Sequence, residues 1–300
     1  MEILVVGSVA LDSIQTPFGS VCEALGGSAT HFSCSAGFFS SVGLVGVVGS
    51  DFPGEHETFL RRRDINLEGL ERADGRTFRW RGYYEYDLNQ AHSLETQLNV
   101  FEHFHPKLPP AYRQAPYVFL ANIDPELQLE VLDQVSDPKL VVCDTMNFWI
   151  EHKREALVET LGRVDIALMN DSEARELCGT YSLLDSARKI RSWGPSTVIL
   201  KKGEHGALMF SDATHFAAPA YPLEDIKDPT GAGDSFAGGF VGHLASTGDF
   251  SEANIRRAVI YGSVMASFNV EGFGTERLHT LREAEVARRY DEFKEITLFE

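Results

Sequence analysis

The stretch from Asp228 to Phe240 carries the residue types that anion binding and proton transfer require. It reads Asp-Pro-Thr-Gly-Ala-Gly-Asp-Ser-Phe-Ala-Gly-Gly-Phe. Pro229 restricts the backbone of a turn, while Gly231 and Gly233 permit torsions that other residues avoid. Apolar residues then follow at helical spacing, so the stretch is predicted to be a loop that opens a helix.

The backbone amides at this predicted helix start would point toward an anion. The N–H groups of Gly231, Ala232 and Gly233 would be unpaired donors of the first turn, and phosphate is a ligand that suits them. Asp234 would repel an anion unless its carboxylate had a task, and a general base is a task that fits. The alternative is that this acidic residue merely caps the helix.

Composition argues against several classes of function. The chain has 300 residues, 43% of them hydrophobic, and can bury a substantial core. Its formal charge is −17, from 27 basic and 44 acidic residues. The scattered basic residues predict neither a nucleic-acid surface nor a membrane-binding face, and no apolar run is long enough to span a bilayer. The four cysteines (Cys22, Cys34, Cys143 and Cys178) form no CxxC pair, so we expect a reducing cytoplasm rather than a zinc site or a disulfide framework.

Alternating strand and helix patterns are expected to position the chemical groups. Ile3 to Val9 is an apolar run of strand length that leads to Asp12, which would place a carboxylate where ligands of open α/β sheets gather. Gly26 and Gly27 form a flexible entry to a helix of small residues. Further strands are expected at 44–48, 117–123, 140–143, 164–169, 197–200 and 207–210, and helices at 53–63, 125–135, 151–161, 172–178, 183–193, 255–268 and 281–293. This rhythm predicts an α/β fold with a parallel sheet.

The pattern changes between Arg76 and about Val100. Polar residues alternate there with aromatic and apolar ones, among them Trp80 and Tyr84. This period of two predicts half-buried strands in an inserted hairpin or small sheet. The aromatic residues could form an ordinary hydrophobic face, a dimer surface or a lid over a ligand.

The motifs that are absent narrow the chemistry. The chain contains no GxxxxGK[ST], and its first strand is not followed by GxGxxG, so neither a P-loop NTPase nor an ordinary Rossmann dehydrogenase is supported. An anion cradle with an embedded carboxylate favours phosphoryl transfer to a hydroxyl group, with Asp234 taking the hydroxyl proton. A divalent cation should assist, because ATP phosphates in so acidic a protein need neutralising.

The Asp228 to Phe240 stretch closely resembles the C-terminal signature of the ribokinase-like (PfkB) family of carbohydrate and nucleoside kinases. Gly26-Gly27 resemble the family's N-terminal di-glycine, and Asn170-Asp171-Ser172-Glu173 is similar to its NxxE motif. Lys202 to Gly206 resembles the loop that borders the nucleotide. The resemblance covers the whole chain and implies one ribokinase-like domain over 1–300. That domain would be a three-layer α/β/α fold with a mostly parallel sheet and a β lid at about 76–100, to which 12–25 could contribute.

The resemblance also implies roles for individual residues. Asp234 would be the catalytic base and Gly231 to Gly233 the anion hole, while Asp12 would bind the substrate. Asn170 and Glu173 would orient Mg2+ through its waters. The nucleotide would meet Lys201, Gly203, Gly206, Thr230, Gly231, Gly233, Ala266 and Gly272. In some members of the family potassium supports the anion hole, and a monovalent cation site here would draw on carbonyl groups near Asp228, Thr230, Ser267, Val270 and Gly272.

Several of these residues have a purely structural alternative. Asp12 could be a turn residue at the end of a strand, and Gly26-Gly27 a plain helix entry. Asn170 and Glu173 could form a capping box. A solvated position is slightly favoured for Lys201 over a phosphate contact.

The predicted substrate pocket departs from that of sugar-specific members. Ribokinase carries asparagines where this chain has Ala10 and His31, so ribose-type recognition is in doubt. His31 could hydrogen-bond a sugar, stack on a base, or be a buried helix residue with one satisfied nitrogen. Asn122 and Asn147 follow predicted strands, could face the pocket, and favour a polyhydroxy ligand.

The sequence therefore predicts a cytoplasmic, ATP-dependent kinase that phosphorylates a hydroxyl of a sugar or related polyol. The first alternative is a nucleoside or vitamin-alcohol kinase, which a large apolar pocket built from Trp80, Tyr84 and Phe38 would favour. The second is a nucleotide-binding regulator that has lost catalysis. No nucleic-acid or membrane partner is expected, and the lid could form a homodimer interface.

Overall fold

The computed structural model describes residues 1–212 and 214–298, and its main element is a nine-stranded sheet. The strand order is β13-β12-β11-β10-β9-β8-β1-β4-β5. The strands are β1 (Ile3–Val6), β4 (Val42–Gly49), β5 (Ile65–Ala73), β8 (Tyr117–Leu120), β9 (Leu140–Cys143), β10 (Ile166–Asn170), β11 (Thr197–Lys201), β12 (Ala207–Phe210) and β13 (His215–Ala218). All pair in parallel except β12 and β13, which pair antiparallel at one edge. The predicted α/β class with a mostly parallel sheet is confirmed.

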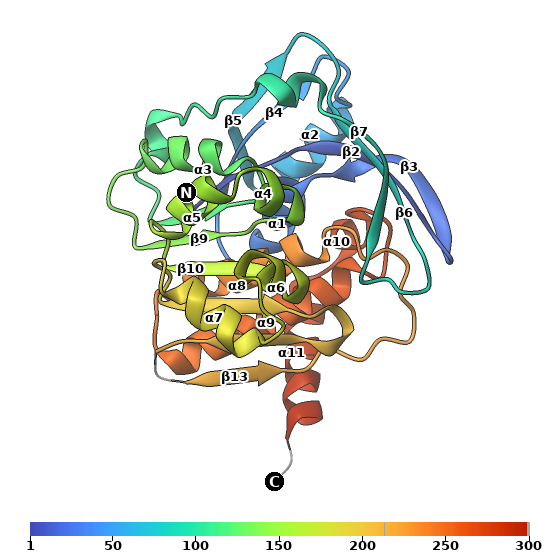
Figure 1. Ribbon diagram of the computed structural model, residues 1–300. Helices are drawn as coiled ribbons and strands as arrows, with labels where there is room; N and C mark the ends of the chain where they lie inside the picture. The colour runs from blue at the N-terminus through green and yellow to red at the C-terminus, as the bar shows by residue number, and fades with distance from the viewer. Residues whose placement is uncertain (213, 299–300) are drawn as a thin grey trace.

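Helices cover both faces of this sheet (Figure 1). One face packs against α1 (Ser28–Ala36), α2 (Gly54–Arg62), α8 (Ala232–Thr247), α9 (Glu252–Asn269), α10 (Glu276–Thr280) and α11 (Glu283–Thr297). The other packs against α3 (Pro125–Leu132), α4 (Asn147–His152), α5 (Arg154–Leu161), α6 (Asp171–Cys178) and α7 (Leu183–Arg191). Neighbouring residues of β1 show why its sequence is continuously apolar: Val5 belongs to the first core cluster and Val6 to the second.

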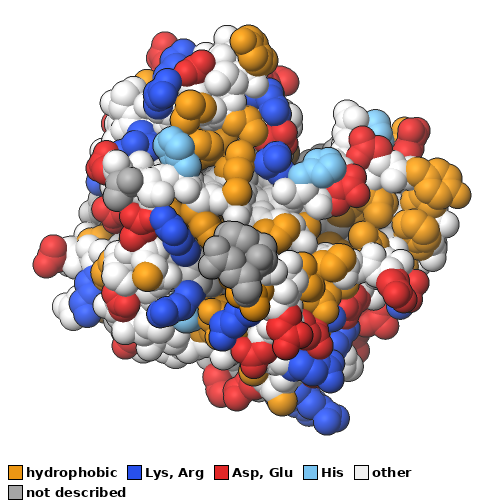
Figure 2. Space-filling model, turned by 90° about the horizontal axis from the view of Figure 1, so that it is seen from below, with side chains coloured by type: hydrophobic (Ala, Val, Ile, Leu, Met, Phe, Trp, Pro, Cys, Tyr) orange, Lys and Arg blue, Asp and Glu red, His pale blue; other side chains and the backbone are white. Residues whose placement is uncertain are grey.

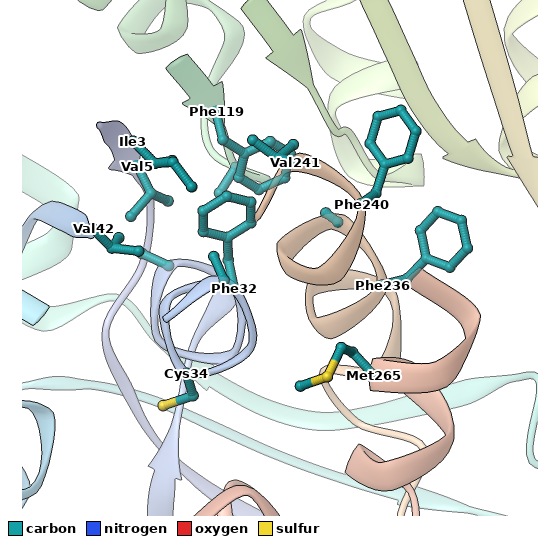
Figure 3. Packing of buried hydrophobic residues seen from close by; sticks show 14 of the residues in the cluster. Ile3, Val5, Phe32, Cys34, Val42, Phe119, Phe236, Phe240, Val241 and Met265 are labelled. Carbon is teal, nitrogen blue, oxygen red and sulfur yellow. The ribbon is translucent and has the colours of Figure 1, made fainter. Parts of the chain in front are cut away.

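Helix α8 lies unusually close to its neighbours because it is rich in glycine. A Cβ atom at Gly238 would lie 2.5 Å from the carbonyl oxygen of Phe32 on α1, and one at Gly239 would lie 2.6 Å from that of Tyr261 on α9. Figure 3 shows the packing beside this contact, where Phe32 stacks on Phe119 of the sheet with ring centroids 4.2 Å apart. The close packing expected from the small residues of α8 is thus present, and it fixes the start of the helix.

A second sheet of four strands stands to one side of the first (Figure 1). Its order is β3-β2-β6-β7, from β3 (Gly19–Gly26), β2 (Ala10–Thr16), β6 (Phe78–Tyr84) and β7 (Ala91–Gln97). Strands β2 and β6 pair in parallel, whereas β2 with β3 and β6 with β7 are antiparallel. We call this element the lid sheet. It joins the predicted 76–100 hairpin to the segment around 12–25.

The position of Asp12 corrects one expectation. The apolar run from Ile3 to Val9 is not one strand, because β1 ends at Val6 and the chain re-enters a strand at Ala10 in the lid sheet. Ser8 lies between the two, with its hydroxyl accepting the N–H of Ser28 at 2.9 Å. Asp12 is therefore a strand residue of the lid sheet and not the end of the first parallel strand.

Other differences concern elements that the sequence did not predict and one helix that is divided. Strands β3, β5 and β13 and the short α10 are not predicted by the sequence, and the helix expected at 151–161 is divided at Lys153 into α4 and α5. Across the described residues, no helix combines the length and the apolar character needed to cross a membrane. Acidic and basic side chains are interspersed on the face seen in Figure 2, in keeping with the scattered basic residues of the sequence.

Candidate active site

The glycine-rich motif forms the start of α8. Gly231 caps the helix with φ 74°, a left-handed conformation that a side chain would strain. Ala232, Gly233 and Asp234 make up the first turn, whose amides have no partner within the helix. Asp234 is partly buried. The predicted loop and helix start are thus present, with a carboxyl group placed among helix N-terminal amides.

The surroundings of Asp234 hold its carboxyl group near the midpoint of ionisation. Burial and, after it, the negative charge of Asp144 raise the pKa of Asp234 to about 7, while the ammonium group of Lys201 opposes both. Lys201 forms an ion pair with Asp144 at 2.5 Å, and only 17% of its side chain is exposed. A Cβ at Gly233 would lie 3.0 Å from the Lys201 nitrogen. The solvated position favoured for Lys201 is wrong, because its ammonium group lies beside the anion cradle.

Asp12 is the second carboxyl group of the site. It is 5% exposed, and burial raises its pKa to about 7, against the lowering effect of a hydrogen bond from the Gly27 amide. The charges of Asp228 and Asp234 contribute to this rise. Gly27 reaches Asp12 with φ 94°, and Gly26 packs so closely on the Asp12 carboxyl group that a side chain would overlap it. The di-glycine is therefore shaped around Asp12.

Two aromatic residues of β6 share this part of the lid sheet. Trp80 pairs in register with Asp12, so both side chains project from the same face. The Trp80 indole lies along the strand over Gly82, and its Nε1 donates to the Ser93 hydroxyl at 2.9 Å. Tyr84 lies nearer to α8, since its hydroxyl accepts a hydrogen bond from Thr230 Oγ1 at 3.2 Å. Burial raises the pKa of Tyr84, and the charges of Asp228, Asp12 and Asp234 add to the rise.

His31 lies beneath the anion cradle. It is 1% exposed on α1, and its ring packs so closely on Gly231 that a side chain there would overlap it. Nδ1 lies 2.9 Å from Oδ1 of Asn269, while Nε2 has no hydrogen-bond partner among the described residues. Burial lowers the pKa of His31 to about 4, so the ring is neutral at physiological pH.

Asn170 and Glu173 form the capping box that the sequence left open. Asn170 Oδ1 accepts the Glu173 N–H at 2.8 Å, and Glu173 Oε2 accepts the Asn170 N–H at 2.7 Å. Glu173 is nevertheless 6% exposed, and burial raises its pKa to about 8 although Lys201 acts in the opposite direction. Glu173 thus caps α6 and also keeps a buried carboxyl group close enough to Lys201 and Asp144 for their charges to change its own pKa.

The loop between β11 and β12 approaches the lid hairpin. Gly203 has φ 54° and packs directly against the side chain of Asn89, in the loop joining β6 and β7. Gly206, with φ 82°, packs against Ala218 and Pro219. Ala266 lies near the end of α9 and Gly272 in the turn that follows it. These segments border the same end of the sheet as α8.

Three predicted pocket residues have other contacts. Asn122 Oδ1 accepts a hydrogen bond from the Trp149 indole at 3.0 Å, and Asn147 donates to Glu176 at 2.6 Å. Phe38 follows α1 at its far end and packs under the Arg63 guanidinium, 4.8 Å from its ring centroid. Phe38 therefore does not join Trp80 and Tyr84 in the apolar pocket that would favour a nucleoside, because a whole helix separates it from the cradle.

The carbonyl groups proposed for a monovalent cation are partly engaged by the protein. The Val270 oxygen accepts the N–H groups of Lys227 at 2.8 Å and Asp228 at 3.3 Å. The Thr230 oxygen accepts the side-chain amide of Asn269 at 2.7 Å. Because a carbonyl oxygen has two lone pairs, Val270 has none to spare and Thr230 has one. Of the five carbonyls, the Val270 oxygen therefore does not fit a cation ligand, and the Thr230 oxygen would have to be shared with Asn269.

Sequence reasoning missed two residues of the site. Asp144 follows β9 directly and is 3% exposed. A polar residue at the carboxyl end of a buried strand is a sequence signal that could have identified it. Asn269 is fully buried at the end of α9. The role of Asn269 is visible only from its hydrogen-bond partners in the folded chain, and no sequence spacing connects it to them.

Comparisons with known proteins identify the family to which this chain belongs. The model of the pfkB family carbohydrate kinases matches residues 3–280. The chain is 31% identical over 246 residues to the cytidine kinase of Thermococcus kodakarensis, covering 80% of this chain and 87% of that protein. It is 25% identical over 237 residues to a nucleoside kinase of Methanocaldococcus jannaschii, covering 78% and 74%. The crystal structure of adenosine kinase from Sinorhizobium meliloti aligns with a TM-score of 0.80 at 18% identity, covering 97% and 99%.

Fold and relatives together define a phosphotransferase that acts on a hydroxyl group. The chain belongs to the pfkB family of carbohydrate kinases, as the resemblance of its sequence implied.

Proposed function

We propose that this protein is an ATP-dependent kinase that phosphorylates a hydroxyl group of a nucleoside. The observation that carries the proposal is the flat indole of Trp80 beside the buried carboxyl group of Asp12. A carboxyl group suits the hydroxyls of a sugar, and an aromatic face suits a base. A free sugar would use only the first of these groups.

Asp234 acts as the general base. With a pKa raised to about 7, its carboxylate is present at neutral pH and is still basic enough to accept a hydroxyl proton as the bond to phosphorus forms. The amides from Gly231 to Gly233 would receive the charge that develops on the transferred group. Lys201 would add a positive charge from the side of Gly233. The proton moves to the Asp234 carboxylate, and the phosphoryl group moves from ATP to the substrate oxygen.

Mg2+ would be held mainly by water and by the ATP phosphates. The described residues contain no cluster of three or more metal-ligating side chains, and Mg2+ bound to nucleotides commonly keeps several waters. The buried Glu173 carboxyl group, beside Asn170, is proposed for such an outer role; burial raises its pKa, and a cation nearby would favour its ionised form. When bound, the ion would neutralise phosphate charge. Lys201, Gly203, Gly206, Ala266 and Gly272 are proposed to border the nucleotide.

The nucleobase would lie against Trp80. Ser93 and Gly82 hold the indole flat on the face of the lid sheet that carries Asp12. Tyr84 completes this face next to Thr230, where the ribose would approach Asp234. The names of the cytidine and nucleoside kinases among the relatives support this class of substrate. Asn122 and Asn147, which are held by Trp149 and Glu176, would bound the pocket without being its main polar groups.

The experiment is a coupled ADP-release assay with ATP and Mg2+ over pyrimidine nucleosides, purine nucleosides, free pentoses and hexoses. We expect kcat/KM to be higher for at least one nucleoside than for any free sugar. A clear preference for a free sugar would contradict the nucleoside proposal and favour the sugar kinase expected first from the sequence. No transfer to any acceptor would favour a nucleotide-binding regulator.

A homodimer through the lid sheet is part of the same proposal. The lid exposes Phe18 by 54% and Leu94 by 57%, which leaves apolar area available for a second copy. Sedimentation velocity of the wild-type protein and of a double Phe18→Ser, Leu94→Ser variant tests it. A monomeric wild-type protein would contradict it.

A further inference from the structure

The anion-hole loop is held by one buried asparagine. Asn269 is fully buried at the end of α9, and its Nδ2 donates to the Thr230 carbonyl at 2.7 Å. Its Oδ1 accepts a hydrogen bond from the Ser235 hydroxyl at 3.0 Å and lies 2.9 Å from His31 Nδ1. One side chain therefore links α1, α8, α9 and the residue that precedes the anion hole.

A second set of contacts fixes the same loop from below. Asp228 is fully buried, and its carboxylate accepts the N–H groups of Thr230 and Gly274, each at 2.9 Å. The backbone of Asp228 is tied in turn to the Val270 carbonyl at 3.3 Å. Thr230 is thus held at its N–H by Asp228 and at its oxygen by Asn269. A cation that drew on the Val270 carbonyl would compete with its two N–H donors, and at Thr230 it would share the oxygen with the Asn269 amide.

We propose that Asn269 is a positioning residue that orders the anion hole from within the protein, so that phosphoryl transfer needs no monovalent cation. The amide N–H group of Asn269 supplies partial positive charge at the Thr230 oxygen, as a cation drawing on that oxygen would. Its Oδ1 fixes the tautomer of His31 by accepting from Nδ1, and so holds the ring flat against Gly231. The role is independent of which hydroxyl compound is the acceptor.

The first experiment measures kcat of the wild-type protein in KCl, NaCl and choline chloride at equal ionic strength, with whichever acceptor supports ADP release or, failing any, with ATP hydrolysis. We expect less than about a twofold difference, because no step draws on the cation. Activation of tenfold or more by KCl over choline chloride would overturn the proposal. This outcome is distinct from a failure of the nucleoside assignment, which concerns the acceptor alone.

The second experiment compares Asn269→Asp with Asn269→Leu. The Asp variant keeps an acceptor for Ser235 and His31 but cannot donate to the Thr230 oxygen, and its charge favours a nearby cation. We expect kcat to fall about tenfold, as for the loss of one buried hydrogen bond, with smaller changes in KM, and we expect KCl to restore part of kcat. The Leu variant lacks the charge and should show no restoration.

A merely structural role for Asn269 would lower kcat of both variants without any response to KCl, and that result would overturn the proposal. Unchanged kcat in Asn269→Asp would overturn it as well. Thermal melting and ATP binding by calorimetry establish that each variant is folded. If Asn269→Asp does not fold, the wild-type measurement in the three salts decides.

Discussion

The two carboxyl groups of the site have similar pKa values but very different supports. Burial raises the pKa of both Asp234 and Asp12 to about 7. Asp234 stands on α8, which is wedged between α1 and α9 by glycine contacts and backed by the large core. Asp12 stands on a four-stranded sheet that helices do not enclose. On the proposed function, the large sheet would position the groups that transfer phosphate, and the lid sheet would position those that bind the acceptor.

Removal of the proposed base on α8, Asp234, should have the largest effect. Asp234→Asn keeps size and polarity but cannot accept the hydroxyl proton, and loss of a general base lowers turnover by about 10²- to 10⁴-fold. We expect kcat to fall in this range with little change in KM, measured by ADP release. Asp133→Asn, on the exposed end of α3, is the matched control and should retain full activity. Comparable losses in both variants would contradict a special role for Asp234.

A change in the lid sheet should alter binding instead. Trp80→Ala removes the proposed base platform, and stacking on an aromatic side chain is worth about 1–3 kcal/mol per base. We therefore expect kcat/KM for the preferred nucleoside to fall roughly 5- to 150-fold, mostly through KM. Trp80→Phe keeps an aromatic face and should fall much less. An equal effect on a free sugar would show that Trp80 supports the lid and does not contact the base.

The support of α8 can be tested by stability alone. In Gly238→Ala the added carbon would lie 2.5 Å from the Phe32 carbonyl oxygen, so helix and neighbour must separate. Overpacking of this kind costs about 1–3 kcal/mol, and we expect Tm to fall by several degrees in a thermal melt. Gly54→Ala, where nothing lies within 4 Å of the added carbon, is the control and should leave Tm nearly unchanged. Equal melting of the two variants would show that α8 is less tightly wedged than its glycines indicate.

The same contrast explains which parts of the fold the sequence could predict. Buried parallel strands such as β9, apolar throughout, were found with correct bounds, because both faces of the sheet are covered. The missed strands β5 and β13 are the two edges of the large sheet, and β3 is an edge of the lid sheet. Edge strands carry exposed polar residues that blur the pattern. Their place depends on pairing between distant segments, which periodicity does not report.

Some residues of the candidate site could be predicted from the sequence and others could not. The motif from Asp228 to Phe240 could be placed from its residues, since glycines and a carboxylate at a helix start have a direct physical meaning. Asp144 contacts Lys201, 57 positions away in the chain, and Asn269 contacts Thr230 and His31, 39 and 238 positions away. Burial gives these contacts their strength, and burial is a property of the folded chain.

The smallest predicted effect is a shift in the midpoint of the pH profile of kcat/KM. Variants beside Asp234 should shift this midpoint, whereas a variant in the lid sheet should not. A base must be ionised to act, so kcat/KM should rise with pH and level off above a midpoint near the Asp234 pKa of about 7. Asp144 raises this pKa and Lys201 lowers it. Asp144→Asn should therefore move the midpoint to lower pH, and Lys201→Met should move it to higher pH, even where both variants lose part of kcat.

Trp80→Phe is the matched control for these two variants, because it changes the lid sheet without changing any charge near Asp234. Its midpoint should stay at the wild-type value while its KM moves. The measurement is kcat/KM for one acceptor between about pH 5 and 9 for all four proteins. If the midpoints for Asp144→Asn and Lys201→Met move in the same direction, the rise of kcat/KM with pH does not report the ionisation of Asp234. Opposite shifts would show that the rise of kcat/KM with pH reports the Asp234 carboxyl group. A general loss of packing would not shift the midpoint in opposite directions when a negative and a positive charge are removed.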